Sequence, residues 1–553
     1  MARSAVRPTL ADRVVNWFDP VAGERRLRAR AFQAAMGGYA GASETARTMR
    51  TWFTRGQSAD ADVVSDLPKL RERSRDLVRN HPLAGGALHT IVTRTVGTGL
   101  ALQPRPNRKV LGWTEERVAQ WREHLLAEWC LWAESRWCDL GGRLDFYGLQ
   151  ELVFRSTLES GDTFTLLPMV RRGGLPYRLA LQVLEADRVG NPGGQTDTDT
   201  MVAGVQLDAM TGAALRFHVY NRHPGGLSID RIYEGRWVPA ATPRGAPAIL
   251  HHYRMMRPGQ TRGVPHLAPV IEPLKQLGRY TDAEIMAAVV SGMFTVFVKS
   301  DGPETNPLMV GTDASGAPQS GSDSVKLENG AIIGLSPGED ISIADPKRPN
   351  TAFDPFVMAV MRQIAVGLEL PFEVLVKHFT SSYSAARAAL LDAYQFFRAR
   401  RDWLRKSFCQ PVFEAWMEEA VALGRIEAPG FLQDPAMRAA YCRAVWTGDS
   451  PGSLDPVKEI SAWTSAIDAH LATREQAEME LFGTDFAASL DQKAAEARML
   501  REAGLSVAPA APGGAPALDA PQPDDESEDD AEDDEEPDDD ERVAQPAPRA
   551  PQD

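Results

Sequence analysis

Apolar residues recur at helical intervals between the two prolines Pro371 and Pro411. The recurring positions are Leu390, Tyr394, Phe397, Leu404 and Phe408, at successive steps of four, three, seven and four. This spacing is typical of the apolar stripe of an amphipathic helix. Pro411 lacks an amide hydrogen and crowds the carbonyl four residues earlier, so the helix is expected to kink or end near residues 407–410. The pattern resumes at Phe413 and Trp416.

Arginine side chains follow the same periodicity beside this stripe. Arg398, Arg401 and Arg405 lie at i, i+3 and i+7, which places them on one side of the helix. On the pattern alone, a solvated surface explains this basic side as well as any specific role. A polar run at residues 377–384 precedes the helix.

The same patterns predict an α+β fold that is mainly helical. Helices are expected at residues 67–96 with an interruption at Pro82, and at 114–132, 145–161, 271–293, 353–369, 385–424, 455–471 and 473–482. Short strands are expected at residues 100–103, 164–170, 177–184, 217–220 and 294–299, with two more within 326–343. Asp145 is the expected N-cap of its helix. Trp121, Trp129 and Trp132 share one side of a helix, where core packing explains them better than stacking on bases.

The net negative charge of the chain is concentrated in one segment. The 553 residues are 43% apolar, which suffices for several domains with cores. Fifteen of the 75 acidic residues lie within residues 524–541, so the rest of the chain carries as many acidic residues as Lys and Arg. A protein that holds DNA tightly is expected to present a strongly basic domain. A protein that is neutral outside this segment, with local rows of basic residues, would instead allow a DNA duplex to pass without being held tightly.

Residues 505–553 are rich in Pro, Ala and acidic residues and are expected to be disordered. Their acidic run either imitates DNA toward basic partners or keeps the protein soluble. No stretch of the chain reaches about 18 uncharged apolar residues, and Asp12, Asp19 and Glu24 stand where a signal peptide would be apolar. A cytosolic protein without a membrane segment is therefore expected.

Motifs for catalysis or metal binding are missing from the sequence. It contains no GxxxxGK[ST], GxSxG or HExxH pattern. The best ligand candidates are explained more simply as packing or surface residues: His218, His223, His251, His252 and His266. The four cysteines, Cys130, Cys138, Cys409 and Cys442, form no CxxC pair and are expected to be free thiols. We therefore expect no metal, no cofactor and no enzymatic activity.

Four stretches, in order along the chain, resemble the portal proteins of lambda-type tailed phages. They are RDLVRNHPLAGG at 75–86 with VGTGL at 96–100, DFYGLQ at 145–150 with ESGD at 159–162, RPGQTRGVP at 257–265, and SYSAARAALL at 382–391 with FCQPVFEAW at 408–416. Each motif is weak alone, but four in the same order are specific. The resemblance covers roughly residues 10–500.

The resemblance implies a portal fold with wing, stem, clip and crown parts. Its expected divisions are an N-terminal Arg-rich arm (1–60), a wing (61–270), a first stem helix (271–293), a clip (294–350), a second stem helix (351–370), a channel-narrowing loop (371–384), a long kinked helix (385–424), wing and crown helices (425–504) and a disordered acidic tail (505–553). The arm is either disordered or packs on a neighbour or on a capsid shell.

The resemblance further implies a ring, usually a dodecamer, at one capsid vertex of the virion, assembled in the host cytoplasm. Such a ring nucleates head assembly with the major capsid protein and scaffold, docks the terminase large subunit, passes double-stranded DNA without sequence specificity and then holds tail-connector proteins. The residues expected nearest the DNA are Lys377, His378, Thr380, Ser381 and Ser382 of the loop, with Arg387, Arg398, Arg401 and Arg405 as lumen or intersubunit charges. For the arginines, salt bridges between subunits are an equal alternative to contact with DNA.

Two other classes of function stay open as alternatives. A structural capsid or scaffold protein without a channel is less favoured because of the insertion at 294–350 between two helices. A packaging-associated nuclease or protease is less favoured because the sequence offers no paired carboxylates and no nucleophile with a base.

Overall fold

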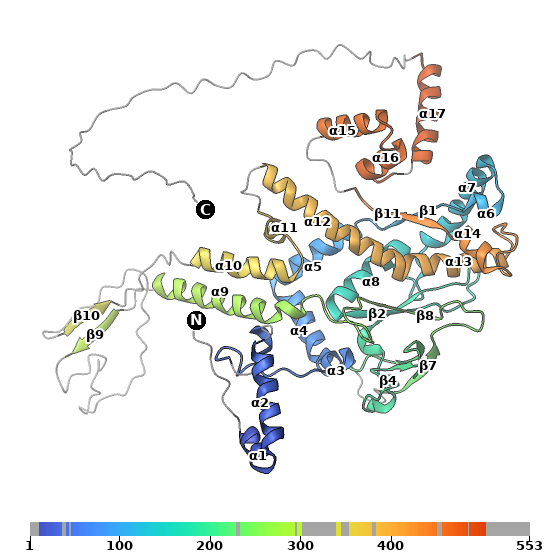
Figure 1. Ribbon diagram of the computed structural model, residues 1–553. Helices are drawn as coiled ribbons and strands as arrows, with labels where there is room; N and C mark the ends of the chain where they lie inside the picture. Colours follow the sequence, from blue (N-terminus) through green and yellow to red (C-terminus); the bar gives the residue numbers. More distant parts are fainter. Residues whose placement is uncertain are drawn as a thin grey trace, which may run out of the picture. The chain divides into compact units, whose positions relative to one another are not determined.

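The computed structural model describes residues 10–35, 40–43, 46–227, 233–292, 296–300, 339–343, 353–378, 383–450, 456–484 and 486–504. The chain divides into two compact units, Met1–Phe486 and Ala487–Asp553. In the described part of the second unit the regular element is helix α17 (Phe486–Glu502), which begins at the boundary. The other described helices and strands belong to the first unit (Figure 1).

The N-terminal segment, which was predicted as an Arg-rich arm, contains several helices. Its elements are α1 (Leu10–Phe18), α2 (Pro20–Ala35), η1 (Ala40–Ala42) and α3 (Ala59–Val63). Asp19 separates the first two helices, and its carboxylate accepts hydrogen bonds of 3.0 Å from the amides of Val21 and Ala22. This side chain therefore caps the start of α2, as an aspartate at a helix N-terminus commonly does.

A helical core occupies the first unit. It contains α4 (Leu67–Asn80), α5 (Pro82–Thr95), α6 (Arg108–Leu111), α7 (Glu115–Ala133), η2 (Arg136–Cys138) and α8 (Phe146–Ser160). Pro82 separates α4 from α5 as predicted, because a proline fits the first turn of a helix but not its interior. Asp145 caps α8, as predicted. Trp121, Trp129 and Trp132 are all buried, which confirms their prediction as core residues.

Short antiparallel sheets lie beside this core. One has the order β3-β2-β8, from β2 (Asp162–Leu166), β3 (Gln182–Glu185) and β8 (Ile249–Tyr253); η3 (Ala186–Arg188) and η4 (Pro192–Gly194) follow β3. A second has the order β4-β5-β6-β7, from β4 (Met201–Val202), β5 (Val205–Leu207), β6 (Ala214–Tyr220) and β7 (Gly235–Pro239). In the first sheet Phe164 stands opposite Leu184 on one side and His251 on the other. The strands predicted at 164–170 and 177–184 are shorter than expected, because Pro168 cannot donate to a ladder.

A short 3-10 helix leads into the region predicted as stem and clip, which contains two α-helices and two paired strands. These elements are η5 (Ala268–Val270), α9 (Ile271–Gly292), β9 (Val296–Ser300), β10 (Glu339–Ile343) and α10 (Phe353–Gly367). β9 and β10 pair antiparallel, with Val298 opposite Ile341. β10 agrees with one of the two strands expected within 326–343, and the other falls outside the described residues. The tail at 505–553 also lies outside them.

The long kinked helix is present, and its interruption has a specific form. Its parts are α12 (Tyr383–Leu404), the π-helical turn η6 (Arg405–Cys409) and α13 (Gln410–Ala422), and the short helix α11 (Phe372–Val376) precedes it in the sequence. The amide of Gln410 bonds to the carbonyl of Arg405, five residues back, directly before Pro411. The kink predicted from this proline is therefore a π turn. The expected loop at 371–384 begins with helix α11, because Val374 and Leu375 are buried there.

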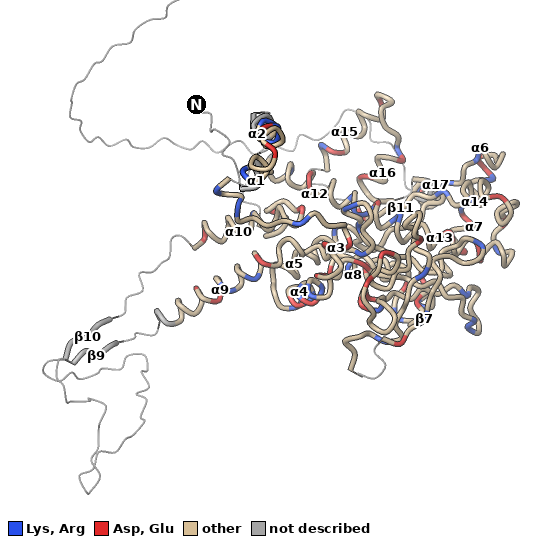
Figure 2. The backbone as a smooth tube through the Cα atoms, turned by 60° about the horizontal axis from the view of Figure 1, so that its bottom comes forward, with Lys and Arg blue, Asp and Glu red and all other residues tan. Residues whose placement is uncertain are grey.

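Shorter elements follow, as predicted for this part of the chain. They are α14 (Pro435–Tyr441), β11 (Ala444–Thr447), α15 (Pro456–Asp468) and α16 (Arg474–Phe482). β11 pairs with β1 (Ala101–Pro104). Thr473 and Gln476 form a capping box at the start of α16. No helix within the described residues is long and apolar enough to cross a membrane. Figure 2 shows basic and acidic positions interspersed over the described chain.

Candidate functional site

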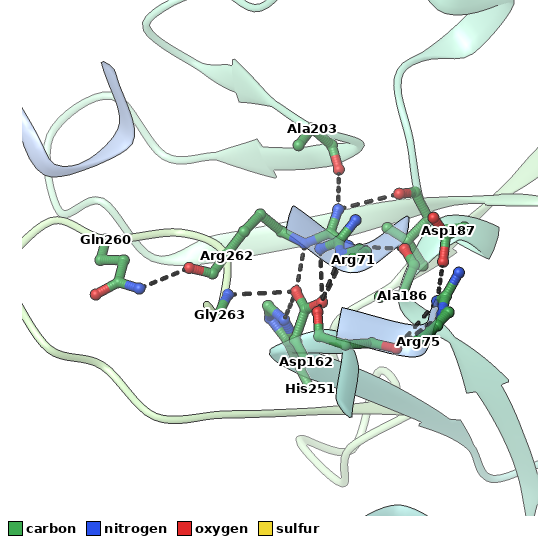
Figure 3. A network of polar contacts seen from close by, with 12 residues as sticks. Arg71, Arg75, Asp162, Ala186, Asp187, Ala203, His251, Gln260, Arg262 and Gly263 are labelled. Carbon is green, nitrogen blue, oxygen red and sulfur yellow. Dashed lines mark hydrogen bonds and ion pairs between the residues drawn. The ribbon is translucent and has the colours of Figure 1, made fainter. Parts of the chain in front are cut away.

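A buried ion network joins distant segments of the first unit. Asp162 begins β2 and has no exposed surface. Its carboxylate accepts a hydrogen bond of 2.8 Å from the Arg71 guanidinium of α4 and another from the Arg262 guanidinium. The Nε2 of His251 on β8 lies 3.1 Å away, and the amide of Gly263 lies 3.4 Å away (Figure 3).

Three of the sequence stretches that carry the portal resemblance meet at this network. Arg75, from the first stretch, donates to the hydroxyl of Ser160 at 3.0 Å and pairs with Asp187. Ser160 and Asp162 belong to the second stretch, and Arg262 belongs to the third. The sequence showed only the order of these stretches, whereas the structure brings them into contact.

Glycine is required where the second and third stretches cross. Gly161 has a φ of +90°, and a Cβ added to it would lie 2.5 Å from the carbonyl oxygen of Gly263. A Cβ added to Gly263 would lie 2.0 Å from the carbonyl oxygen of Gly161. Both distances are impossible for a real side chain, so the two backbones touch only because neither residue has one.

The network is electrostatically satisfied. Burial alone would raise the pKa of Asp162, but the charges of Arg262 and Arg71 outweigh it and hold this pKa far below its ordinary value. Burial lowers the pKa of His251, so its neutral ring donates to the carboxylate. Arg262 also donates to three carbonyl oxygens, of Ala186 at 2.7 Å, Val189 at 3.0 Å and Ala203 at 2.6 Å. We conclude that this network is a structural junction and not a reactive site.

The loop residues predicted to face DNA are only partly described. Lys377 and His378 are exposed at the end of α11, and Lys377 has a φ of +55°. Such a left-handed conformation is uncommon for a residue with a side chain and ends α11 sharply. Thr380, Ser381 and Ser382 lie outside the described residues. Their place relative to the channel stays a prediction.

The arginines predicted beside the apolar stripe have partners within their own chain. Arg387 lies 4.0 Å from Glu459 of α15, and Arg398 pairs with Glu480 of α16. Arg401 donates to the carbonyl oxygen of Thr95 at 2.8 Å and to that of Arg94 at 3.1 Å. Arg405 pairs with Asp402 at 2.8 Å. In the single chain these charges therefore tie α12 to α5, α15 and α16.

A pocket of about 700 Å³ lies between α10, α11 and α12. Phe372, Phe396 and Trp403 contribute its aromatic walls. Its charged lining residues are Arg254, Arg362, Glu369, Asp392 and Arg400. This pocket was not predicted from the sequence. The available signal was the spacing of Arg362, Ala365, Val366 and Glu369 at i, i+3, i+4 and i+7 within the predicted helix 353–369, although α10 itself ends at Gly367.

One carboxylate holds two of the guanidinium groups at this pocket. Glu369 accepts hydrogen bonds from Arg254 at 2.9 Å and from Arg400 at 3.2 Å. Burial lowers the pKa of Arg400 to about 10. Burial alone would raise the pKa of Glu369, but its bonds to the two arginines lower it below the ordinary value. The backbone φ of Glu369 is +57°, so the residue that supplies this carboxylate has a strained backbone.

The histidines and cysteines hold no metal site in the described part of the chain. No group of three or more His, Cys, Asp or Glu side chains is arranged there to hold a metal ion. Burial lowers the pKa of His252 to about 3, and its Nε2 lies 2.9 Å from the hydroxyl of Thr165. The four cysteines are free thiols, as predicted.

Sequence comparisons with known proteins match most of the chain to one family. The family model described as phage portal protein, lambda family, matches residues 45–401. The chain is 26% identical to the portal protein of Escherichia phage N15 over 492 residues, which are 83% of this chain and 89% of the relative. It is 25% identical to portal protein B of Escherichia phage lambda over 490 residues, which are 85% of this chain and 91% of the relative. A chain from the neck of a native gene transfer agent particle, computed with C12 symmetry, is similar with a TM-score of 0.40 and 13% identity, covering 75% of this chain and 92% of that one.

Proposed function

Because the chain belongs to the lambda family of phage portal proteins, we propose that it assembles into a closed ring at one capsid vertex and conducts double-stranded DNA during packaging and ejection. The observation that carries this proposal is the family match over residues 45–401. It spans the elements from α3 to most of α12, including the junction at Asp162 and the paired helices α9 and α10.

The arrangement of α9, the paired strands β9 and β10, and α10 supports the portal assignment over a shell protein. Two helices that leave and re-enter the body around an insertion agree with the expected stem and clip. A ring needs a heterologous interface, in which two different surfaces of one chain meet and the rotation closes. A dodecamer is the expected size for this family.

The charge balance supports passage of DNA without tight binding. Outside residues 524–541 the chain has equal numbers of acidic residues and of Lys plus Arg. A strongly basic channel would hold phosphates by releasing counterions, whereas a neutral one offers little affinity. The work is then done by geometry, which agrees with a structural family and requires no catalytic group.

The residues proposed nearest to DNA are those of the narrowing loop and of the basic side of α12. They are Lys377, His378, Thr380, Ser381, Ser382, Arg387, Arg398, Arg401 and Arg405. The intrachain partners of the four arginines support a second role, in which these charges hold α12 in place beside the channel.

The proposed partners follow from a position at the capsid vertex. The terminase large subunit would dock during packaging, and tail-connector proteins would bind afterwards. The major capsid protein and scaffold would surround the ring during assembly in the host cytoplasm, before the ring becomes part of the virion.

The proposal is tested by negative-stain electron microscopy of the purified chain, with mass photometry on the same sample. Closed rings with a central hole are expected, with a mass near a multiple of 60.5 kDa that corresponds to the counted subunits. Open sheets or shells would contradict the proposal and favour a capsid protein. A chain that stays monomeric at every protein and salt concentration would contradict self-assembly into a ring.

A further inference from the structure

Helix α9 carries an apolar stripe that the other described residues leave exposed. Asp282, Ile285, Met286 and Val289 lie at i, i+3, i+4 and i+7, the spacing of one helix face. Ile285 and Met286 are each 61% exposed and Val289 is 46% exposed. An amphipathic stripe of this kind is normally buried against another element.

The stripe faces away from the partner of α9 within the subunit. α9 packs on α10 through Tyr280, whose ring stacks on Phe353 with centroids 5.6 Å apart. At about 100° per residue, the stripe centred on Ile285 and Val289 lies on the side of α9 opposite Tyr280. It is therefore free to contact another molecule.

A groove with the complementary pattern lies on the other side of α10. Its first wall is formed by Arg362, Ala365 and Val366 of α10 with Glu369 just beyond the end of that helix, and its second wall is the α12 stripe of Asp392, Gln395, Phe396, Ala399, Arg400 and Trp403. The groove is the pocket of about 700 Å³ described above. Val366 is 79% exposed at its edge. Two parallel stripes with an apolar floor form the kind of groove that accepts an amphipathic helix.

The stripe and the groove lie on opposite sides of one subunit. Both views show α10 between α9 and α12 (Figures 1 and 2). The groove opens between α10 and α12, whereas the stripe lies on α9 away from α10. Two complementary surfaces on opposite sides of a subunit are the requirement for head-to-tail assembly, and a closing rotation makes the assembly a ring.

The charges of the two surfaces are complementary. Asp282 lies in the stripe and forms no ion pair within the described residues. Arg362 lies in the groove and, within the same part of the chain, contacts the ring of Phe372 with its guanidinium 5.5 Å from the centroid but pairs with no carboxylate. The groove also holds Arg254 and Arg400, which share the single carboxylate of Glu369. The groove therefore holds three guanidinium groups against the two carboxylates of Glu369 and Asp392, and the stripe supplies a further carboxylate.

We propose that the Asp282–Val289 stripe of α9 docks into the α10–α12 groove of a neighbouring copy of this chain, with Asp282 beside Arg362. This inference rests on the proposed ring and specifies the surfaces that build it. Ile285, Met286 and Val289 fill the groove against Phe396 and Trp403. The burial of these apolar side chains drives the contact, and the charge pair sets its register.

Disulfide cross-linking tests the contact in the full chain. With Ile285→Cys and Val366→Cys in the same chain, mild oxidation is expected to give a ladder of linked species in denaturing gels. A mixture of the two single variants is expected to give dimers only, because each chain then has one new thiol. Ala283→Cys paired with Val366→Cys is the matched control, since Ala283 is an exposed residue of α9 that points away from the stripe.

Charge reversal tests the register. Arg362→Glu places a carboxylate opposite Asp282 and is expected to raise the protein concentration needed for rings about tenfold. Asp282→Arg alone is expected to do the same, and the two changes together are expected to restore assembly. Arg362→Gln removes the cation and its contact with Phe372 without introducing a negative charge, so the difference between Arg362→Gln and Arg362→Glu measures the repulsion by Asp282 alone.

The outcomes distinguish this interface from the ring itself. Closed rings that form without the 285–366 cross-link, or that tolerate both single reversals, would overturn the proposed contact and leave the ring standing. A parent chain that neither forms rings nor gives a cross-linked species at any concentration would overturn both. A cross-link equal in the Ala283 control would also overturn the contact, because it would show random collision.

Discussion

Removal of the Asp162 carboxylate should strongly lower the folding stability, because this one anion pairs with two buried cations. Asp162→Asn keeps the size of the side chain but leaves Arg71 and Arg262 without their carboxylate. Breaking a buried ion pair on one side costs about 3–5 kcal/mol of folding stability. We expect the urea midpoint of the variant to fall accordingly at neutral pH.

The residue next to Arg71 supplies the control for this prediction. Glu72 also pairs with a cation, Lys69 of the same helix, but both side chains are more than 60% exposed. Glu72→Gln is expected to change stability by about 0–1 kcal/mol, as for other surface pairs. If Asp162→Asn lowered the folding stability as little as Glu72→Gln does, the network would contribute little to the stability of the fold.

Local chemistry explains which residues could be predicted from the sequence. The Asp145 cap and the tryptophan core were predictable because each depends on neighbours within a few turns of one helix. The pairing of Asp162 with Arg262 was not, since 100 residues separate them and the same letters also occur in exposed pairs. Sequence spacing indicates a helix face but does not indicate which distant segment covers it.

At the scale of the element, Glu369 follows the end of α10 in a backbone conformation that is unfavourable for a residue with a side chain. Glu369 occupies the left-handed region with a φ of +57°, where a glycine would be unstrained. Glu369→Gly and Glu369→Ala both remove the carboxylate from Arg254 and Arg400. Only the glycine also relieves the backbone, so it is expected to be more stable than the alanine variant by about 1 kcal/mol.

The sign of this difference should reverse inside α10, which ends at Gly367, two residues before Glu369. Gln363 is an exposed residue inside α10. There Gln363→Ala is expected to be more stable than Gln363→Gly by about 1 kcal/mol, since alanine favours the helical backbone. Thermal unfolding of the four variants measures both differences. Equal stability of the two Glu369 variants would mean that this position stores no strain.

Long elements were predicted more completely than short ones, for a physical reason. Helices such as α7 and α9 repeat their periodic pattern over several turns, so the signal accumulates. α11 has five residues and β5 has three, too few for a period to stand out. Pro411 predicted an interruption, but a proline does not specify whether the helix breaks, bends or adopts a π turn.

At the scale of the whole molecule, the channel of the proposed ring would be built by more than one chain. The basic side of α12 was predicted from its spacing, and the structure gives its arginines intrachain partners. The groove beside it was missed because its two walls belong to helices that are separate in the sequence. A channel is formed only by an assembled ring. The sequence of one chain therefore indicates the helices and loops that would build the channel more clearly than the side chains that would line it.

The acidic segment yields a prediction about the ring and its DNA. Deleting residues 524–541 removes fifteen negative charges and leaves the chain formally neutral. At ~10 mM ionic strength, where the Debye length is about 30 Å, the deletion is expected to raise the affinity of rings for a labelled duplex about tenfold. At ~150 mM this length is about 8 Å, and the difference should shrink below about twofold. Fluorescence anisotropy at both salt concentrations measures the change.

A neutral replacement separates charge from chain length. Exchanging the fifteen Asp and Glu residues for Asn and Gln should reproduce the deletion if charge is responsible. A segment that imitates DNA should also compete as a free peptide and should still act at ~150 mM, because a bound mimic contacts its partner directly. A segment that serves solubility should not compete, and its deletion should increase aggregation. Unchanged affinity at low salt would contradict any electrostatic action of this segment on DNA.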